Sequence, residues 1–173
     1  MSKQQPYRPV DDDARRLARS LITQAHFAAL AVRDVDGAPL VSRIAVAPTA
    51  EGAPMALASD LSQHSQCLKS DPVASLLLGE PKDRGDPLTY PRLTLQAKVH
   101  FIRHGDDDHA KMAARFVAHQ PKTKLYIGFS DFAILTFDIT TVFLNGGFGK
   151  AYNLRPSDLI TPTNQVRAGS VPR

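Results

Sequence analysis

The alternation of apolar and polar residues is most regular between Arg92 and Phe101. One set of alternate positions is apolar: Leu93, Leu95, Ala97, Val99 and Phe101. The other set is polar: Arg92, Thr94, Gln96, Lys98 and His100. A period of two over this length predicts a β-strand with one face on a core and the other in water or at a polar site.

Shorter apolar runs predict the remaining strands: His26–Val32, Leu40–Ala47, Pro54–Ala58, Val73–Leu78, Phe132–Asp138 and Thr141–Leu144. Asp34-Val35-Asp36-Gly37 is typical of a tight turn, so the first two runs form a hairpin. Helical spacing of apolar residues predicts helices over roughly residues 12–25 and over Asp106–His119. A short helix is expected over Ser62–Ser70, ending before Pro72.

Tight turns, not regular helical crossovers, connect most of these strands. The pattern therefore favours a mainly β (α+β) fold, an antiparallel barrel-like sheet of six to seven strands with peripheral helices, over a doubly wound parallel sheet. We expect a single domain over residues 1–173. Its ordered core covers about residues 10–160, between a flexible N-terminal arm and a C-terminal tail.

Composition narrows the class of ligand. The net charge is +4, and lysine and arginine are scattered, which suits a small anionic ligand better than nucleic acid. No apolar run is long enough for a membrane span, and residues 1–6 lack the apolar stretch of a secretory signal. With Cys67 as the single cysteine, a reducing, cytoplasmic location is expected.

The polar turn 58–64 carries the candidate chemistry. Ser59, Ser62 and His64 stand where a strand gives way to a helix, and helix starts have unpaired N–H groups that bind phosphate. Ser42 and Arg43 on a neighbouring strand could add a hydroxyl and a guanidinium to the same anion. The alternatives are that the two serines are helix caps, that His64 is an exposed helix residue, and that Arg43 is a surface residue.

Three other patterns have simpler explanations. Asp60, Ser62 and His64 are crowded within one turn and lack the Gly-x-Ser-x-Gly motif of a hydrolase. The group His100, His104, Asp106–Asp108 and His109 is typical of a strand end and an acidic helix start, so no metal site is predicted. Gly147-Phe148-Gly149-Lys150 lacks the rest of a P-loop. No residue stands out as a general acid or base.

An ordered set of short motifs carries a family resemblance: Pro39–Arg43, Ser59–Ser65, Asp71-Pro72, Ser75–Leu78, Asp86–Leu88, Arg92–Leu95, Asp131-Phe132 and Gly146–Ala151. Together they resemble the FMN-binding split barrel of the pyridoxamine 5′-phosphate oxidase superfamily, in particular its HugZ-type, haem-utilisation branch. The resemblance covers about residues 12–155. It implies a homodimer with the ligand site at the subunit interface.

The resemblance also implies roles for single residues. Arg43 matches a strand arginine that contacts the FMN phosphate, and Ser62, Gln63 and His64 match a Ser-Arg-Lys turn that holds it. Arg92 matches a glutamine beside the flavin, and Lys150 lies near a substrate-binding arginine. The chain departs from the oxidases in having no tryptophan, and from HugZ-type haem oxygenases in having no histidine after His119.

Two functional hypotheses follow. The first is an FMN-binding, flavin-dependent oxidoreductase-like protein of unknown substrate, in which the redox chemistry belongs to the flavin. The second is a non-catalytic module of the same fold that binds flavin or haem for storage or utilisation.

Overall fold

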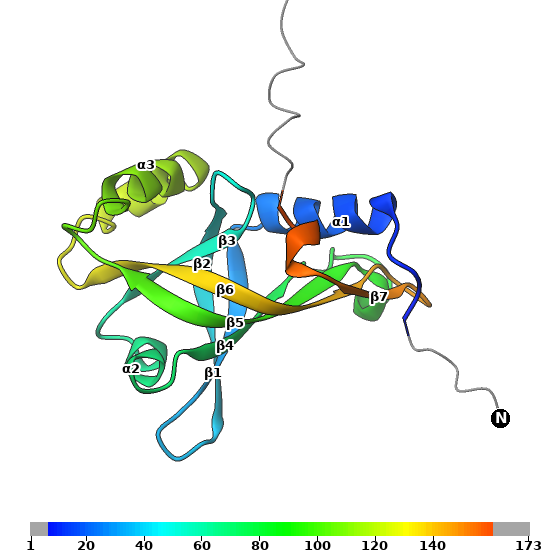
Figure 1. Cartoon of the computed structure of the whole chain (residues 1–173), viewed down its shortest axis with the longest axis horizontal. Helices are drawn as coiled ribbons and strands as arrows, with labels where there is room; N and C mark the ends of the chain where they lie inside the picture. Colours follow the sequence, from blue (N-terminus) through cyan, green and yellow to red (C-terminus); the bar gives the residue numbers. More distant parts are fainter. Residues whose placement is uncertain (1–6, 161–173) are drawn as a thin grey trace, which may run out of the picture.

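The computed structural model describes residues 7–160, which form a closed antiparallel barrel with helices at its periphery (Figure 1). The strands are β1 (Phe27–Arg33), β2 (Pro39–Pro48), β3 (Pro54–Ser59), β4 (Val73–Leu78), β5 (Arg92–Ile102), β6 (Phe132–Asn145) and β7 (Ala151–Leu154). Their order is β3-β2-β1-β4-β5-β6-β7, and β3 also pairs with β6. Six strands therefore close the barrel and β7 lies outside it, which confirms the predicted fold class.

The last long strand corrects the sequence prediction. Phe132–Asp138 and Thr141–Leu144 are not separate strands but parts of β6, which runs unbroken for 14 residues. A register shift opposite Gln96 and Ala97 of β5 inserts one extra residue into β6. The inward positions therefore change from odd to even numbers, from Leu135 and Phe137 to Val142 and Leu144. A β-bulge has this effect, and it hid the continuity of the strand.

Two smaller elements also differ from prediction. β7 was not predicted, because only Tyr152 and Leu154 of its four residues are buried. The helix α3 (His109–His119) begins three residues later than expected. Asp106 lies outside it, and its carboxylate accepts a hydrogen bond from the backbone N–H of Arg103.

Apolar side chains fill the barrel interior. Alternate residues of all six barrel strands join one buried cluster, with Leu30, Leu76 and Leu95 among its most enclosed members. Small barrels of this kind are packed solid.

A helix closes each end of the barrel. The helix α1 (Asp12–Thr23) contributes Ala14, Ala18 and Ile22 to the interior cluster, and the side chain of Asp11 caps its start by accepting from Ala14 N–H. The helix α2 (Gln63–Ser70) contributes Cys67 and Leu68. Cys67 is buried and acts as a small packing residue there.

The third helix covers part of the barrel's outside. Phe116 of α3 is fully buried in a second cluster with Met55 of β3 and Ile134 of β6. This cluster lies outside the barrel wall, where β2, β3 and β6 meet.

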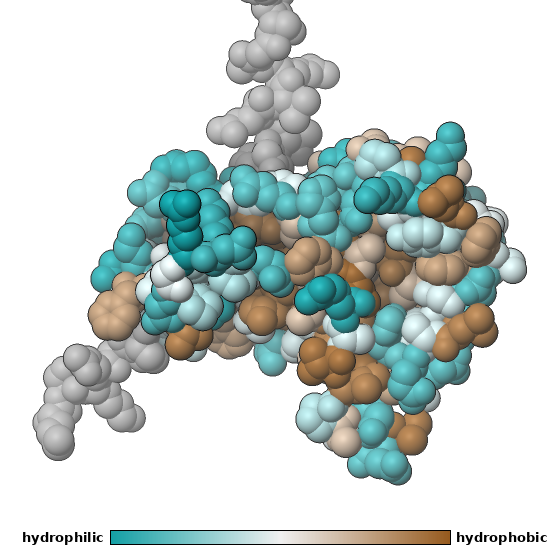
Figure 2. All heavy atoms as spheres, turned by 180° about the vertical axis from the view of Figure 1, so that it is seen from behind, coloured by the Kyte–Doolittle hydropathy of each residue, from teal (hydrophilic) through white to brown (hydrophobic). Residues whose placement is uncertain are grey.

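Within residues 7–160, the outward side chains in the middle of β2, β1, β4 and β5 join neither buried cluster. Register places Arg43, Ala29, Leu77 and Thr94 in one row across the four strands. The next row is Val41, Ala31, Ser75 and Gln96. We call these two rows the open face. Val41 is 64% exposed and Leu77 43%. From behind, apolar atoms gather in the middle of the molecule above the protruding β1–β2 turn (Figure 2).

Among residues 7–160, none of the helices has the length and apolar character needed to cross a bilayer.

Replacing Phe116 by alanine should lower the free energy of unfolding by about 3–5 kcal/mol, because it leaves a cavity in the second cluster. Urea denaturation of the full chain measures this. Phe148→Ala is the matched control: Phe148 is 95% exposed, and its loss should change stability by less than about 0.5 kcal/mol. Equal unfolding midpoints for the two variants would contradict the role of α3 described here.

Candidate functional site

The predicted site residues fall into three places. Ser42, Ser59, Ser62 and His64 meet at the α2 end of the barrel. Arg43 lies on the open face, since its neighbour Ser42 points the other way, toward His64. Arg92 and Lys150 lie at the opposite end, where Arg92 pairs with Asn145 and Lys150 follows the β6–β7 turn. Gln63 is exposed at the first position of α2.

The α2-end residues are bonded to one another. Ser62 Oγ donates to the Ser59 carbonyl at 2.6 Å, so its only proton is used there. His64 Nε2, 2.9 Å away, must then donate to Ser62 Oγ. This leaves His64 Nδ1 to accept from Ser42 Oγ at 3.0 Å. Both ring nitrogens of His64 are therefore occupied within the protein.

Burial sets the protonation state of this imidazole. His64 is half-buried, and burial lowers the pKa of His64 below its ordinary value of 6.5. A lowered pKa keeps the ring neutral at physiological pH, and the two serine contacts fit a neutral ring. The protein without ligand thus offers no positive charge at His64.

A second network fixes the polar turn in place. Ser59 Oγ donates to Asp131 Oδ2 at 2.5 Å, and Asp60 receives two hydrogen bonds from Arg103, at 2.7 and 3.0 Å. Lys69 Nζ lies 3.2 Å from the same carboxylate. The Arg103 hydrogen bond is the main cause that holds the pKa of Asp60 below its usual range.

Sequence reasoning missed Arg103 and Lys69 as partners of this turn. Arg103 follows β5, 43 positions after Asp60, so no local spacing signalled the pair. Ser62 precedes α2, yet its side chain makes no capping bond to the helix. The described contacts do not bring Arg43 or Arg92 to this cluster. A phosphate shared by Arg43 and Ser62 stays a prediction.

On the open face, Arg43 has a different environment. Its guanidinium carbon lies 5.0 Å from the centre of the Phe27 ring. Within residues 7–160, no carboxylate lies within ion-pair distance of Arg43. A groove of about 240 Å³ runs beside it, with Phe27, Ala29 and Glu80 in its lining. This places a cation that has no close ion pair beside an aromatic ring, in a groove whose lining also includes the Glu80 carboxylate.

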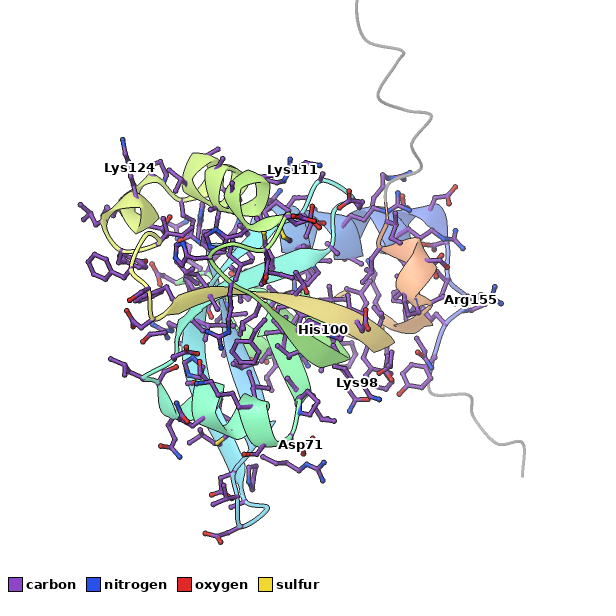
Figure 3. The ribbon with its side chains drawn as sticks, turned by 60° about the vertical axis from the view of Figure 1, so that its left-hand side comes forward. Asp71, Lys98, His100, Lys111, Lys124 and Arg155 are labelled. Carbon is purple, nitrogen blue, oxygen red and sulfur yellow. The ribbon has the colours of Figure 1, made fainter. Side chains whose placement is uncertain are left out.

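The outward residues of β5 and the loop after it carry further polar side chains. Lys98 and His100 project from one face of β5 (Figure 3), and His100 Nε2 lies 2.9 Å from Asp138. Arg92 donates to the Leu88 carbonyl at 3.0 Å, which ties down the loop before β5. The rings of His104 and His109 lie 4.1 Å apart. Over the described residues, no three histidine, cysteine or acidic side chains converge as metal ligands would.

Comparison with known proteins agrees with this architecture. The family model described as CREG, beta-barrel matches residues 9–160. The chain belongs to this CREG beta-barrel family. A protein of the pyridoxinephosphate oxidase family from Clostridium acetobutylicum has the same fold, with a TM-score of 0.65, 12% identity, and coverage of 87% of this chain and 99% of its own. The predicted resemblance to the split barrel is confirmed.

Two relatives with higher sequence identity have names that refer to haem. The chain is 28% identical over 118 residues to the chloroplastic non-canonical heme oxygenase HOZ of Arabidopsis thaliana, covering 68% of this chain and 35% of that protein. A heme binding protein from Mycobacterium smegmatis has 27% identity and a TM-score of 0.77, with coverage of 87% of this chain and 61% of its own. The chain thus spans about a third of the length of one relative and under two thirds of the other.

The lowered pKa of His64 makes stability depend on pH. In the unfolded chain this imidazole takes up a proton near pH 6.5, but in the folded chain only at lower pH. Below about pH 6.5 the unfolded state therefore binds more protons than the folded state. The free energy of unfolding is highest above this pH and falls as the pH drops.

We expect His64→Gln to reduce this loss between about pH 7.5 and 5, measured by urea unfolding at each pH. Burial also lowers the pKa of His109, which accounts for the slope that remains. Equal slopes for the parent and His64→Gln would show that His64 is not held neutral.

Proposed function

We propose that this protein binds haem as a homodimer, with the haem at the edge of the open face. The observation that carries the proposal is the open face itself, an outward surface with small and apolar side chains in its middle, which ends at the Phe27 ring and the Arg43 guanidinium. Haem is a planar apolar macrocycle with two carboxylates, so it requires a surface of this composition.

The floor of the open face is flat because its central side chains are small. Ala29, Ala31 and Ser75 occupy the middle of β1 and β4, between Val41 and Leu77. A planar ring can approach such a surface closely, and the apolar area covered supplies most of the binding free energy, at about 25 cal/mol per Å².

Arg43 supplies the polar recognition. Its guanidinium is free to bind a carboxylate, and a bidentate pair of this kind is both strong and directional. The Phe27 ring beneath it holds the guanidinium at the edge of the groove.

The relatives support haem over flavin. Both relatives reported above at more than 25% identity are named for haem. The α2 turn, where the resemblance to the oxidases implies an FMN phosphate, has its hydroxyls and imidazole already bonded to one another. A phosphate there would have to displace those bonds without meeting a positive charge at His64.

A second copy of the chain is the partner that suits the rest of the open face. An outward surface with small side chains in its middle and exposed Val41 and Leu77 beside them is suited to an isologous contact with a second copy. Covering the exposed Val41 and Leu77 in this way removes apolar area from water.

FMN binding and flavin-dependent redox chemistry form the second candidate function. Arg43 is compatible with this second function, because a guanidinium binds a phosphate as well as a carboxylate. The two candidates therefore share Arg43 and differ in the ring that stacks on the floor.

Absorbance titration separates them. Haemin added to the full chain should give a saturable Soret band with one haem per chain, while FMN should show no saturable change. Arg43→Ala should weaken haemin binding on the order of tenfold, through loss of one charge-assisted contact. Lys98→Ala, at another outward-facing cation, should have an effect under about twofold. Saturable FMN binding without saturable haemin binding would establish the second candidate instead.

Light scattering tests the dimer. The parent should show about twice the chain mass of 18.9 kDa at micromolar concentration. Val41→Glu places a charge on the β2 side of the proposed contact, beside Ala31, and should give a folded monomer. Val35→Glu, at an 80% exposed turn position, should stay dimeric. A monomeric parent, or a dimeric Val41→Glu variant, would contradict the proposed interface.

A further inference from the structure

A larger groove continues from the Arg43 groove. It has a volume of about 490 Å³ and lies between the second half of α1 and the loop 79–91. Phe27 and Glu80 line both grooves. The wall of the larger groove is mostly apolar, with Leu17, Leu21 and Tyr90 among its members. Its volume falls within the roughly 300–1,000 Å³ of small-molecule sites.

Gly79 allows the loop to form this wall. Its φ of +101° is open to glycine, and a Cβ there would meet the Pro91 carbonyl oxygen at 2.5 Å. The chain can therefore turn back sharply after β4, and Pro91 returns beside Gly79. The backbone turn at Gly79 therefore forms this wall of the groove.

One imidazole lines this groove with its ring nitrogens unoccupied. His26 comes just before β1, is exposed, and borders the groove beside Phe27. Its backbone carbonyl accepts from Val46 N–H and from Gln120 Nε2. In the described part of the chain, neither ring nitrogen of His26 has a hydrogen-bond partner.

The ring of His26 is also held in orientation. It stacks on the ring of His119, with centroids 4.8 Å apart and an interplanar angle of 26°. His119 is itself fixed, because its Nε2 donates to the Ala25 carbonyl at 2.8 Å. His119 thus acts as a positioning residue for His26.

Each of the other histidines is buried or bonded within the protein. His109 is 8% exposed, and the remaining four have at least one ring nitrogen in a contact: His64, His100, His104 and His119. Among the six histidines of the chain, His26 alone combines free nitrogens with an apolar groove that adjoins the open face.

We propose that His26 is the iron ligand for this haem, whose ring lies at the edge of the open face where the groove beneath α1 adjoins the Arg43 groove. This inference rests on the proposed haem binding and names the residue that would coordinate the iron. A neutral imidazole nitrogen is a good ligand for haem iron. Lys82 in the groove lining offers its ammonium to one haem carboxylate, and Arg43 in the adjoining groove offers its guanidinium to the other.

Comparing haemin with metal-free protoporphyrin IX tests this ligand. Both share the ring and the carboxylates, but only haemin has iron. In the full-length parent, haemin should bind at least about tenfold more tightly than metal-free protoporphyrin, measured by quenching of tyrosine fluorescence. His26→Ala and His26→Gln should remove this preference and shift the ferric Soret band. They should change the affinity for metal-free protoporphyrin by less than about twofold.

Added imidazole should return the Soret band of His26→Ala toward that of the parent, because it supplies the missing ligand. His100→Ala is the control and should keep both the preference and the spectrum. If both porphyrins bind the parent but the His26 variants keep the preference and the spectrum, the ligand assignment is wrong and haem binding stands. If neither porphyrin binds the parent saturably, both proposals are wrong.

Discussion

The pairing of β3 with β6 is the constraint on which the rest of this structure depends. Five residue pairs, from Met55 with Thr136 to Ser59 with Phe132, join strands far apart in the chain. They turn an open sheet into a barrel, so β3 no longer presents an unpaired edge. They also place the residues just after β3 beside the residues just before β6. The hydrogen bond of Ser59 to Asp131, and that of Asp60 N–H to the Asp131 carbonyl at 2.6 Å, follow from this closure.

Closure has a consequence for ligand binding. A six-stranded barrel has room inside only for its own side chains, and α1 and α2 block its ends. A cofactor as large as haem or FMN must therefore bind on the outside of the wall. On that outside, α3 covers the region where β2, β3 and β6 meet. The outward face of β2, β1, β4 and β5 joins neither buried cluster of the described residues, so it is the larger surface that remains open on the barrel wall.

Most of the fold was predictable from the sequence, because its strands and helices have clear periodicity. The alternation from Leu93 to Phe101 identified β5 and its inward face correctly. The bulge in β6 was not predictable, because it depends on pairing with β5 and reverses the inward positions within one strand. The candidate site was predicted less well. Spacing indicated that Ser42, Ser62 and His64 lie together, but it could not show that they satisfy one another.

The distribution of unpaired positive charge decides where an anion can bind on this barrel. At the α2 end, Arg103 and Lys69 both lie against the Asp60 carboxylate, and burial keeps His64 neutral. The polar turn therefore has hydroxyl groups but little net positive charge to attract a phosphate. On the open face, Arg43 lies over an aromatic ring and has no carboxylate partner among the described residues. A guanidinium without an ion-pair partner gains more from an incoming anion than one already paired, so Arg43 offers an available positive charge beside this outward face. A planar ligand with acidic groups is the kind of molecule that uses both.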